Sequence, residues 1–244
     1  MATKAEPSGE GYSLTGDKTL VLWGGAADKL IVSARVSGGV RDEDGVALFL
    51  VDPSASGVSL QVYDTQDGLK AAEVKLEGAQ GELLGGDIVG NGLAVIRQAA
   101  DEAIAALCAE AVGAMEKALE LTVDYIKQRE QFGRAIGSFQ GLQFQASDMF
   151  VELELAKSMA MYASMCARDP DPVERSRACS AAKAQVGRSL KALGERSIQL
   201  HGGVGMTMEY SIGHYFKRLS IIDRMFGDVD HHLQQLDAAG GLAA

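Results

Sequence analysis

The feature that most constrains this chain is a change in the spacing of its apolar residues at about residue 91. From there on, apolar residues recur every three or four positions, as they do on the buried face of a helix. The first such run comprises Ile104, Leu107, Cys108, Ala111, Met115, Ala118, Leu119 and Ile126. The pattern predicts helices over about 92–129, 138–168, 172–200 and 208–235, and four helices of this length favour a bundle.

Before residue 91 the chain contains short β-type runs separated by Gly, Asp and Pro. These runs occupy residues 19–23, 29–36, 46–51 and 59–63. The segment SGGVRDEDG at 37–45 tolerates positive φ and lies between two apolar runs, as a hairpin requires. The sequence therefore predicts an α+β chain, with a partial antiparallel β-domain over 1–90 followed by a C-terminal four-helix bundle over 91–244.

Charge limits the classes of partner that the chain can bind. Its formal net charge is -10 at pH 7, whereas binding to nucleic acid or to an anionic membrane depends on a basic excess. The opening MATKAEPSGEG has neither a cationic lead nor a long apolar stretch, and no later segment is apolar over the length of a bilayer. We therefore expect a cytoplasmic protein that binds small molecules or proteins, with no nucleic acid and no membrane.

The residue types that commonly bind metals are not spaced as ligands in this sequence. Cys108, Cys166 and Cys179 lack ligand spacing and read as small buried hydrophobes. His231 and His232 are adjacent, and neighbouring side chains on a helix point about 100° apart, so two ligands to one ion are not expected. The sequence predicts no metal site.

Two glycine-containing joints separate the expected helices, QFGRAIG at 131–137 and HGGVG at 201–205. Helix ends expose unpaired backbone N–H groups, which suit phosphate. Glycine at a helix end more often serves as a C-cap, so the joints by themselves favour a cap.

Three stretches, taken in order and with helices of suitable length between them, resemble the acyl-CoA dehydrogenase family. They are GYSLTGDKTLVLWGGAADKLIVSAR at 11–35, REQFGRAIGSFQGLQ at 129–143 and QLHGGVGMTMEYSIGHYFKRL at 199–219. The similarity extends over essentially the whole chain. It is nearest to the small subunits of the pimeloyl-CoA dehydrogenase type, particularly in the ending IDRMFGDVDHHLQQL.

The resemblance implies an α+β flavoprotein whose FAD lies between subunits, with the helical domain of one subunit closing around the ADP portion. The matching cofactor-binding positions are Arg129, Gln131, Phe132, Gln140, Gln199, Leu200, His201, Gly202 and Gly203. Arg129 matches the family arginine that meets the pyrophosphate region, and the stretch from Gln199 to Gly203 matches the segment around the adenosine end. An arginine fork pairs with phosphate oxygens, and glycines let the backbone approach a ligand closely.

The same resemblance shows departures at the catalytic positions. In the family, a glutamate removes an α-proton from the acyl-CoA while a hydride leaves for the flavin. Its usual position near the C-terminus holds Phe226 here, and the position that some branches use on the first long helix holds Ala103. Asp228 and Asp230 are weak candidates for a replacement base, although acidic residues before a terminal helix are more often N-terminal caps.

The flavin-contacting side of the expected β-domain is also altered. The family's Trp-x-Thr pattern aligns with Leu20 and Leu22, which leaves Trp23 in a shifted position. The resemblance also lacks the family's N-terminal helical domain and first β-strands, so it implies an N-terminally truncated member. Hydrogen bonding to the flavin edge is therefore not expected from this chain.

Matches and departures together imply a subunit that serves the FAD of a neighbour without being catalytic itself. We expect a subunit of an FAD-dependent acyl-CoA dehydrogenase, in which a homologous partner supplies the glutamate of an α2β2 assembly. Acyl-CoA would be the substrate and electron-transfer flavoprotein the electron acceptor. A homo-oligomer that is active with an atypical base and a flavin-free scaffold subunit are the alternatives.

Overall fold

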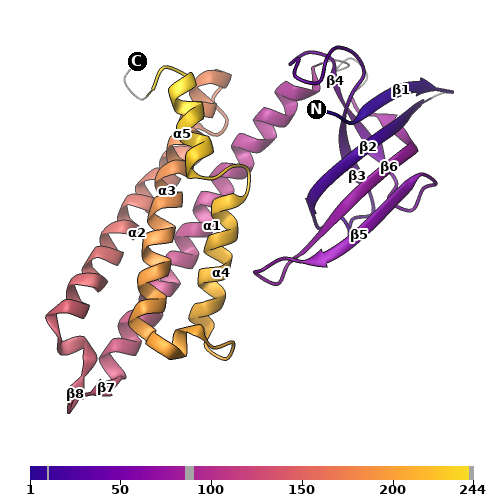
Figure 1. Ribbon diagram of the computed structural model, residues 1–244. Helices are drawn as coiled ribbons and strands as arrows, with labels where there is room; N and C mark the ends of the chain where they lie inside the picture. The colour runs from indigo at the N-terminus through magenta and orange to yellow at the C-terminus, as the bar shows by residue number, and fades with distance from the viewer. Residues whose placement is uncertain (10, 86–90, 242–244) are drawn as a thin grey trace. The chain divides into compact units, whose positions relative to one another are not determined.

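The computed structural model describes residues 1–9, 11–85 and 91–241. The chain divides into two compact units, Met1–Arg97 and Gln98–Ala244. Strands make up most of the first unit and helices most of the second (Figure 1). The α+β fold class is therefore confirmed. The predicted domain boundary at residue 90 falls in segment 86–90, which lies outside the described residues, so that boundary stays a prediction.

The strands of the first unit form one sheet within residues 1–9 and 11–85. They are β1 Lys4–Ser8, β2 Gly11–Leu22, β3 Leu30–Arg35, β4 Val46–Val51, β5 Val58–Asp64 and β6 Lys70–Leu83, in the order β2-β1-β3-β4-β6-β5. Because β6 also pairs with β2, the pairing order returns to its first strand. The sheet is antiparallel except where β1 and β3 pair in parallel at Lys4 and Arg35.

The predicted hairpin around 37–45 is confirmed by the antiparallel register of β3 and β4, which pairs Leu30 with Val51 and Arg35 with Val46. The buried Arg35 side chain organises the connecting loop. Its guanidinium donates hydrogen bonds to the carbonyl oxygens of Asp42 at 2.6 Å and Asp44 at 2.8 Å. A charged side chain thus satisfies loop carbonyls that the strands cannot reach.

The strand prediction missed β1, residues 11–18 of β2 and the whole of β6. β6 pairs with β2, β4 and β5 and contributes buried Val74 and Leu76 to the core. Its other buried positions include Ala71, Ala72 and Ala79, whose small side chains have low β-propensity, and charged residues alternate with them. Tertiary pairing, and not local propensity, makes this segment a strand.

The second unit is built on helices that share one core. They are α1 Gly92–Gln128, α2 Gln140–Cys166, α3 Pro172–His201, α4 Ser211–Arg224 and α5 Val229–Ala238, and α1 begins within the last residues of the first unit. Core residues such as Met115, Met149, Leu193 and Leu219 come from α1, α2, α3 and α4 in turn. The first three predicted helices are confirmed to within two residues. Among the described residues, no helix is long and apolar enough to cross a membrane.

The fourth predicted helix, 208–235, was wrong as a single element. The structure divides it into α4 and α5, which are joined by residues 225–228. Phe226 and Gly227 adopt φ values of 56° and 105°, which a right-handed helix cannot contain. Asp228 then begins α5 by accepting a hydrogen bond from the backbone N–H of His231 at 2.9 Å. The interpretation of an acidic residue here as an N-terminal cap is confirmed for Asp228.

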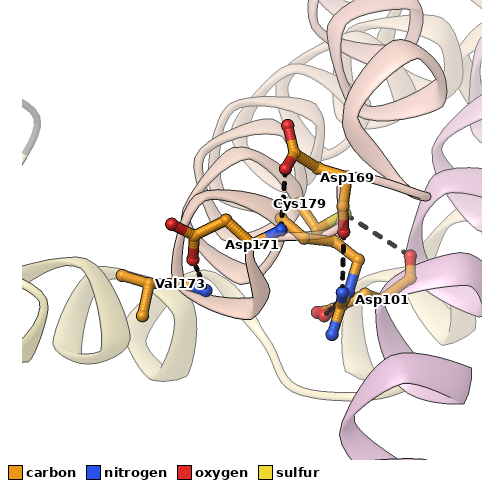
Figure 2. A network of polar contacts seen from close by, with 6 residues as sticks. Asp101, Asp169, Asp171, Val173 and Cys179 are labelled. Carbon is orange, nitrogen blue, oxygen red and sulfur yellow. Dashed lines mark hydrogen bonds and ion pairs between the residues drawn. The ribbon is translucent and has the colours of Figure 1, made fainter.

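A polar network fixes the start of α3 against α1 (Figure 2). The N-cap Asp171 accepts from the backbone N–H of Val173 at 2.8 Å. Arg175, one turn into α3, pairs with Asp101 of α1 at 3.0 Å, and both side chains are buried. Burial raises the pKa of Asp101, and the bond to Arg175 opposes that rise. The pair fixes the relative position of two helices that are far apart in sequence.

Candidate functional site

The two glycine joints lie at the same end of the helical unit. Tyr125, near the end of α1, stacks on His201, the last residue of α3, with ring centroids 4.4 Å apart and planes at 26°. Tyr210, just before α4, contacts both rings, with centroid distances of 5.0 Å from His201 and 6.1 Å from Tyr125. Figure 1 shows the ends of α1 and α3 and the start of α4 together at the lower end of the helical unit. Segments 131–137 and 201–205 therefore project from the same end of the helical unit.

His201 and Leu200 support this end from inside. His201 is 3% exposed, and its Nδ1 lies 2.8 Å from the carbonyl oxygen of Ser197. Burial lowers its pKa, and the bond to Ser197 opposes that shift only in part, so the ring is neutral and Nδ1–H donates to the carbonyl. Leu200 is likewise buried. Both side chains hold the turn in place and are not presented to solvent.

A short hairpin projects from the end of α1. Strands β7 Glu130–Gln131 and β8 Arg134–Ala135 pair with Gln131 opposite Arg134, so Phe132 and Gly133 form the turn with φ values of 56° and 75°. Turns with positive φ at both central residues suit hairpins but favour Asn or Gly at the first of them. Phe132 is nevertheless there, and is 91% exposed. The fold thus presents a large ring to solvent in a strained conformation.

The polar residues predicted for the site are exposed at this same end. Arg129, Gln140 and Gln199 all lie on the surface. Within the described part of the chain, no hydrogen bond or ion pair engages these three side chains, whereas Gln131 donates from Nε2 to the carbonyl oxygen of Glu130 at 2.7 Å. A guanidinium and two amides are therefore free to meet a ligand.

The fold requires glycine at one position of the Gly202–Gly203 pair and not at the other. Gly202 has a φ of 61° and ends α3, where its N–H bonds to the carbonyl oxygens of Ile198 and Gln199, so the expected cap is confirmed there. Gly203 has no positive φ, and a Cβ added to it would meet nothing within 4 Å. At Gly205, by contrast, a Cβ would lie 3.0 Å from Cβ of His201. The fold needs glycine at positions 202 and 205 but gives no reason for it at 203.

This donor set fits the pyrophosphate and sugar portion of a dinucleotide. Phosphate oxygens are bound by arginine forks and by exposed amide groups, and a glycine without a structural role leaves open backbone for close approach. Only part of a cofactor can be accommodated by such an exposed end, so a second surface would have to cover the remainder.

The two positions at which the resemblance places the family's catalytic glutamate differ in exposure. Ala103 is half-buried on α1, whereas Phe226 is 49% exposed in the loop before α5. The backbone N–H of His231 holds the pKa of Asp228 below its usual value, which makes that carboxylate a weaker base. Asp230 is exposed in the first turn of α5.

Sequence reasoning missed a buried polar cluster behind this loop. Lys183 of α3 is fully buried and donates from Nζ to the carbonyl oxygens of Asp223 at 2.7 Å and Gly227 at 2.8 Å. His232 is also buried, with Nδ1 3.1 Å from Oγ of Ser180, and its pKa is lowered to about 4 by burial and then by the Lys183 charge. A lysine in the small-residue run CSAAKAQVG was the available signal. Among the described residues, no group of His, Cys, Asp and Glu could hold a metal ion.

In the β unit, the segment that resembles the flavin-contacting part of the family is irregular. Leu20 and Trp23 have φ values of 50° and 58°, and the β2–β6 register shifts between Lys18 and Val21. Leu20 is 58% exposed and Trp23 is 52% exposed. The segment offers apolar side chains where the resemblance leads us to expect a hydrogen-bonding threonine.

Comparisons with known proteins agree with this picture. Residues 90–239 match the family model described as acyl-CoA dehydrogenase, C-terminal domain. Acyl-CoA dehydrogenase IpdE2 of Mycobacterium tuberculosis is 42% identical over 119 residues, which are 49% of this chain and 35% of that protein. The matched stretch therefore covers about a third of the length of this curated relative.

Solved structures resemble nearly the whole chain. The Tcur3481-Tcur3483 steroid ACAD G363A variant is 30% identical with a TM-score of 0.85, covering 98% of this chain and 62% of that one. The ChsE4-ChsE5 complex from Mycobacterium tuberculosis is 26% identical with a TM-score of 0.79, covering 97% of this chain and 62% of that one. Since the family model covers more than half of the chain, including the helical end built here from Arg129 to Gly203, this chain belongs to the acyl-CoA dehydrogenase family.

Proposed function

We propose that this chain is a subunit of an FAD-dependent acyl-CoA dehydrogenase and binds the ADP portion of an FAD that a homologous partner subunit completes. One observation carries the proposal. Arg129, Gln199 and Gly203 are exposed at the same end of the helical unit. Among the described residues, no interaction within the chain requires arginine, glutamine or glycine at these three positions. Residues that the fold does not require are best explained by a ligand.

Each residue of this end has a definite part in the proposal. Arg129 would pair with the pyrophosphate, while the amides of Gln140 and Gln199 would bond to polar atoms towards the adenosine end. Gly203 would allow close approach of the backbone, and the exposed ring of Phe132 would cover an apolar face of the cofactor. The bound FAD would supply the acceptor for the hydride that leaves the acyl-CoA.

The catalytic base would come from the partner. Phe226 and Ala103 cannot accept a proton, and Asp228 is engaged as a helix cap. The solved ChsE4-ChsE5 complex shows that a chain of this fold can occur with a second chain. We therefore favour a heteromeric assembly, with acyl-CoA as substrate and electron-transfer flavoprotein as electron acceptor, in the predicted cytoplasmic location.

An apolar row on α2 supports assembly with another subunit. Five of the exposed apolar residues of α2 share one face of the helix, namely Phe144, Val151, Leu155, Tyr162 and Met165. Their separations of seven, four, seven and three are those of a helix-packing seam. A flavin-free scaffold would also need such a row, but it would have no use for Arg129 and Gly203.

The test is to remove the Arg129 charge in the assembled complex. The chain would be co-expressed with the proposed acyl-CoA dehydrogenase-like partner that carries the glutamate, and flavin absorbance per complex would be measured on dilution. A charge-assisted contact contributes about 1.5–3 kcal/mol, so Arg129→Ala is expected to weaken FAD binding by about tenfold or more.

Arg168→Ala is the matched control. Arg168 is exposed and lies just past the far end of α2, roughly 40 Å from Gln140 at 1.5 Å per residue. The control variant should retain FAD, and size-exclusion chromatography should show intact oligomers for both. Full flavin occupancy in the Arg129→Ala complex on dilution would overturn the proposed cofactor site.

A further inference from the structure

The hairpin that follows α1 carries a second exposed arginine, Arg134, in addition to Arg129 at its start. Figure 1 shows this hairpin, labelled β7 and β8, at the lower end of the helical unit. Within residues 1–9, 11–85 and 91–241, no hydrogen bond or ion pair engages the Arg134 guanidinium. Its N–H donors are therefore available to a ligand.

The register of the hairpin places Arg134 on the same face as two residues of the proposed cofactor site. Gln131 lies directly opposite Arg134, and side chains directly opposite one another in an antiparallel pair point to the same face. The backbone N–H of Ile136 donates to the carbonyl oxygen of Arg129 at 2.8 Å, which extends the pairing by one residue. Because side chains alternate along a strand, Arg129 shares the face of Gln131, two residues on. Glu130 points to the opposite face.

The two arginines are close enough to bind one ligand. Arg129 is opposite Ile136, so Arg134 is its diagonal neighbour, and the Cβ atoms of such neighbours are about 7–8 Å apart. Two long guanidinium side chains can converge across this distance. Their like charges repel one another until an anion lies between them, and an anion with two negative charges relieves that repulsion most fully.

The ring of Phe139 holds the Arg134 guanidinium in place. The guanidinium carbon lies 4.0 Å from the centroid of this ring. Phe139 is in turn packed edge-on against Phe132, with centroids 6.1 Å apart and planes at 88°. A guanidinium over an aromatic face is held by its positive charge, so its N–H donors stay free for hydrogen bonds. Arg134 is thus positioned without the use of the groups that bind phosphate.

The segment around the hairpin is basic although the chain as a whole is acidic. Residues 127–147 contain three cations, Lys127, Arg129 and Arg134, and a single anion, Glu130, whereas the formal net charge of the chain is -10. The first turn of α2, which begins directly after Phe139, contains no acidic residue. This local excess of positive charge favours an anionic ligand at the hairpin.

We propose that Arg134 is a second phosphate-binding residue, and that Arg129 and Arg134 together clamp the two phosphate groups of the FAD pyrophosphate. The inference rests on the proposed function, because the ligand is the cofactor of that site. A pyrophosphate within a dinucleotide carries a negative charge on each phosphate group, which matches the two guanidinium groups on one face of the hairpin. An arginine fork binds phosphate oxygens through two parallel hydrogen bonds, so each phosphate group engages one arginine.

The experiment compares ligands that differ by one phosphate group. The complex with the proposed glutamate-carrying partner would be freed of FAD, and the Kd values for FAD, ADP and AMP would be measured by calorimetry. Wild type should bind ADP about tenfold more tightly than AMP, because only ADP can engage both arginines. Arg129→Ala and Arg134→Ala should each weaken FAD and ADP by about tenfold. AMP should be weakened by one of the two variants and spared by the other, which identifies the arginine that holds the outer phosphate.

Three further variants separate binding from the shape of the hairpin. Glu130→Ala changes the opposite face of the same hairpin and should leave FAD and ADP bound at least as tightly as in wild type. Arg134→Gln keeps a long polar side chain without the charge and should reproduce the effect of Arg134→Ala. Phe139→Leu removes the ring beneath the guanidinium and should weaken ADP by less than Arg134→Ala does, because the charge remains.

The outcomes distinguish this inference from the proposed function. If Arg129→Ala weakens FAD and ADP but neither Arg134 variant does, the role of Arg134 is wrong and the proposed function stands. If neither Arg129→Ala nor Arg134→Ala changes the Kd for FAD, both are wrong. If Arg134→Ala weakens assembly of the complex and leaves its FAD content unchanged, Arg134 pairs with a carboxylate of the partner, which also overturns the inference. Equal weakening of all three ligands in both variants and in Glu130→Ala would assign the effect to a distorted hairpin and overturn it as well.

Discussion

The helical unit and the β unit of this chain differ in what they present at the positions that resemble cofactor-contacting segments. The helical unit exposes Arg129, Gln199 and Gly203 with no described interaction that competes for their side chains. The β unit exposes Leu20 and Trp23 in strained conformations at a register shift. The helical unit therefore exposes polar groups at these positions, and the β unit exposes apolar side chains. This contrast is what the proposed function requires of a subunit that serves the FAD of a partner.

The largest expected effect is on catalytic rate. If it is not observed, the contrast between the two units does not mark a subunit without a catalytic base. A general base contributes about 10²–10⁴-fold to rate, and the positions that would carry it hold Phe226 and Ala103. We expect the purified chain, supplied with FAD, acyl-CoA and a dye acceptor, to turn over at least about 10²-fold more slowly than the heteromeric complex. Turnover at the rate of the complex would refute this, and Asp230→Asn would then show whether Asp230 is the base.

The next-largest expected effect is on stability, and it tests whether the two units unfold independently. Asp101→Ala leaves the buried Arg175 without its partner, which costs about 3–5 kcal/mol. Helix content at 222 nm reports the helical unit, and Trp23, the one tryptophan of the sequence, reports the β unit. We expect urea unfolding to shift at 222 nm and to remain unchanged in Trp23 fluorescence.

The double variant Asp101→Leu/Arg175→Met is the control for that experiment. It removes both charges together, so most of the lost stability should return. Equal shifts of the two signals in Asp101→Ala would instead show that the units unfold as one body.

The helical unit was also the better predicted of the two, for a physical reason. Apolar residues at three and four positions report a helix face without knowledge of its neighbours, so α1, α2 and α3 were found. Segment β6 is a strand because it pairs with β2, β4 and β5. Its alanines have low β-propensity, so its own sequence does not predict this pairing. The break at Phe226 was missed because phenylalanine is not expected in the left-handed region; Lys183, which fixes that loop, comes from a distant part of the sequence.

The same limits apply to the site. The motif residues from Arg129 to Gly203 were identified by resemblance, but their exposure and their common location needed the structure. The inward position of Leu200 and His201 was not predictable either, because the cluster of the Tyr125, His201 and Tyr210 rings joins three separate segments. The difference between Gly202 and Gly203 appears only in their backbone geometry.

A smaller effect is expected from pH, and it should be confined to the helical unit, which contains all four histidines of the sequence. Burial lowers the pKa of His232 to about 4 and also lowers that of His201, so between pH 6.5 and 4 the unfolded chain binds protons that the folded chain does not. The contribution of these two histidines to stability should therefore be fully present above pH 6.5 and be lost as the pH drops below it. Burial raises the pKa values of Asp101 and Asp223, which opposes this trend at its acidic end.

Urea unfolding at several pH values between 7.5 and 5 checks this prediction. The slope of stability against pH at 222 nm should decrease in His232→Asn, which keeps a polar atom near Oγ of Ser180. Trp23 fluorescence should show little change over the same range. An undiminished slope in the variant would assign the effect to another group.

The smallest expected effect is on FAD retention, and it concerns a single neutral side chain of the helical unit, Gln199. Gln199 lies in the last turn of α3, and its carbonyl oxygen accepts the N–H of Gly202, a bond that an alanine at position 199 would preserve. Alanine is also a better helix former than glutamine, so Gln199→Ala should leave the stability of the chain unchanged. A neutral hydrogen bond contributes about 0.5–1.5 kcal/mol, so the loss of the amide should weaken FAD retention by about two- to tenfold, less than Arg129→Ala does. Gln235→Ala, on the exposed side of α5, is the matched control and should retain FAD fully. If Gln199→Ala and Gln235→Ala lose flavin at the same rate on dilution of the complex, Gln199 does not contact the cofactor, and the site would be limited to the hairpin that follows α1.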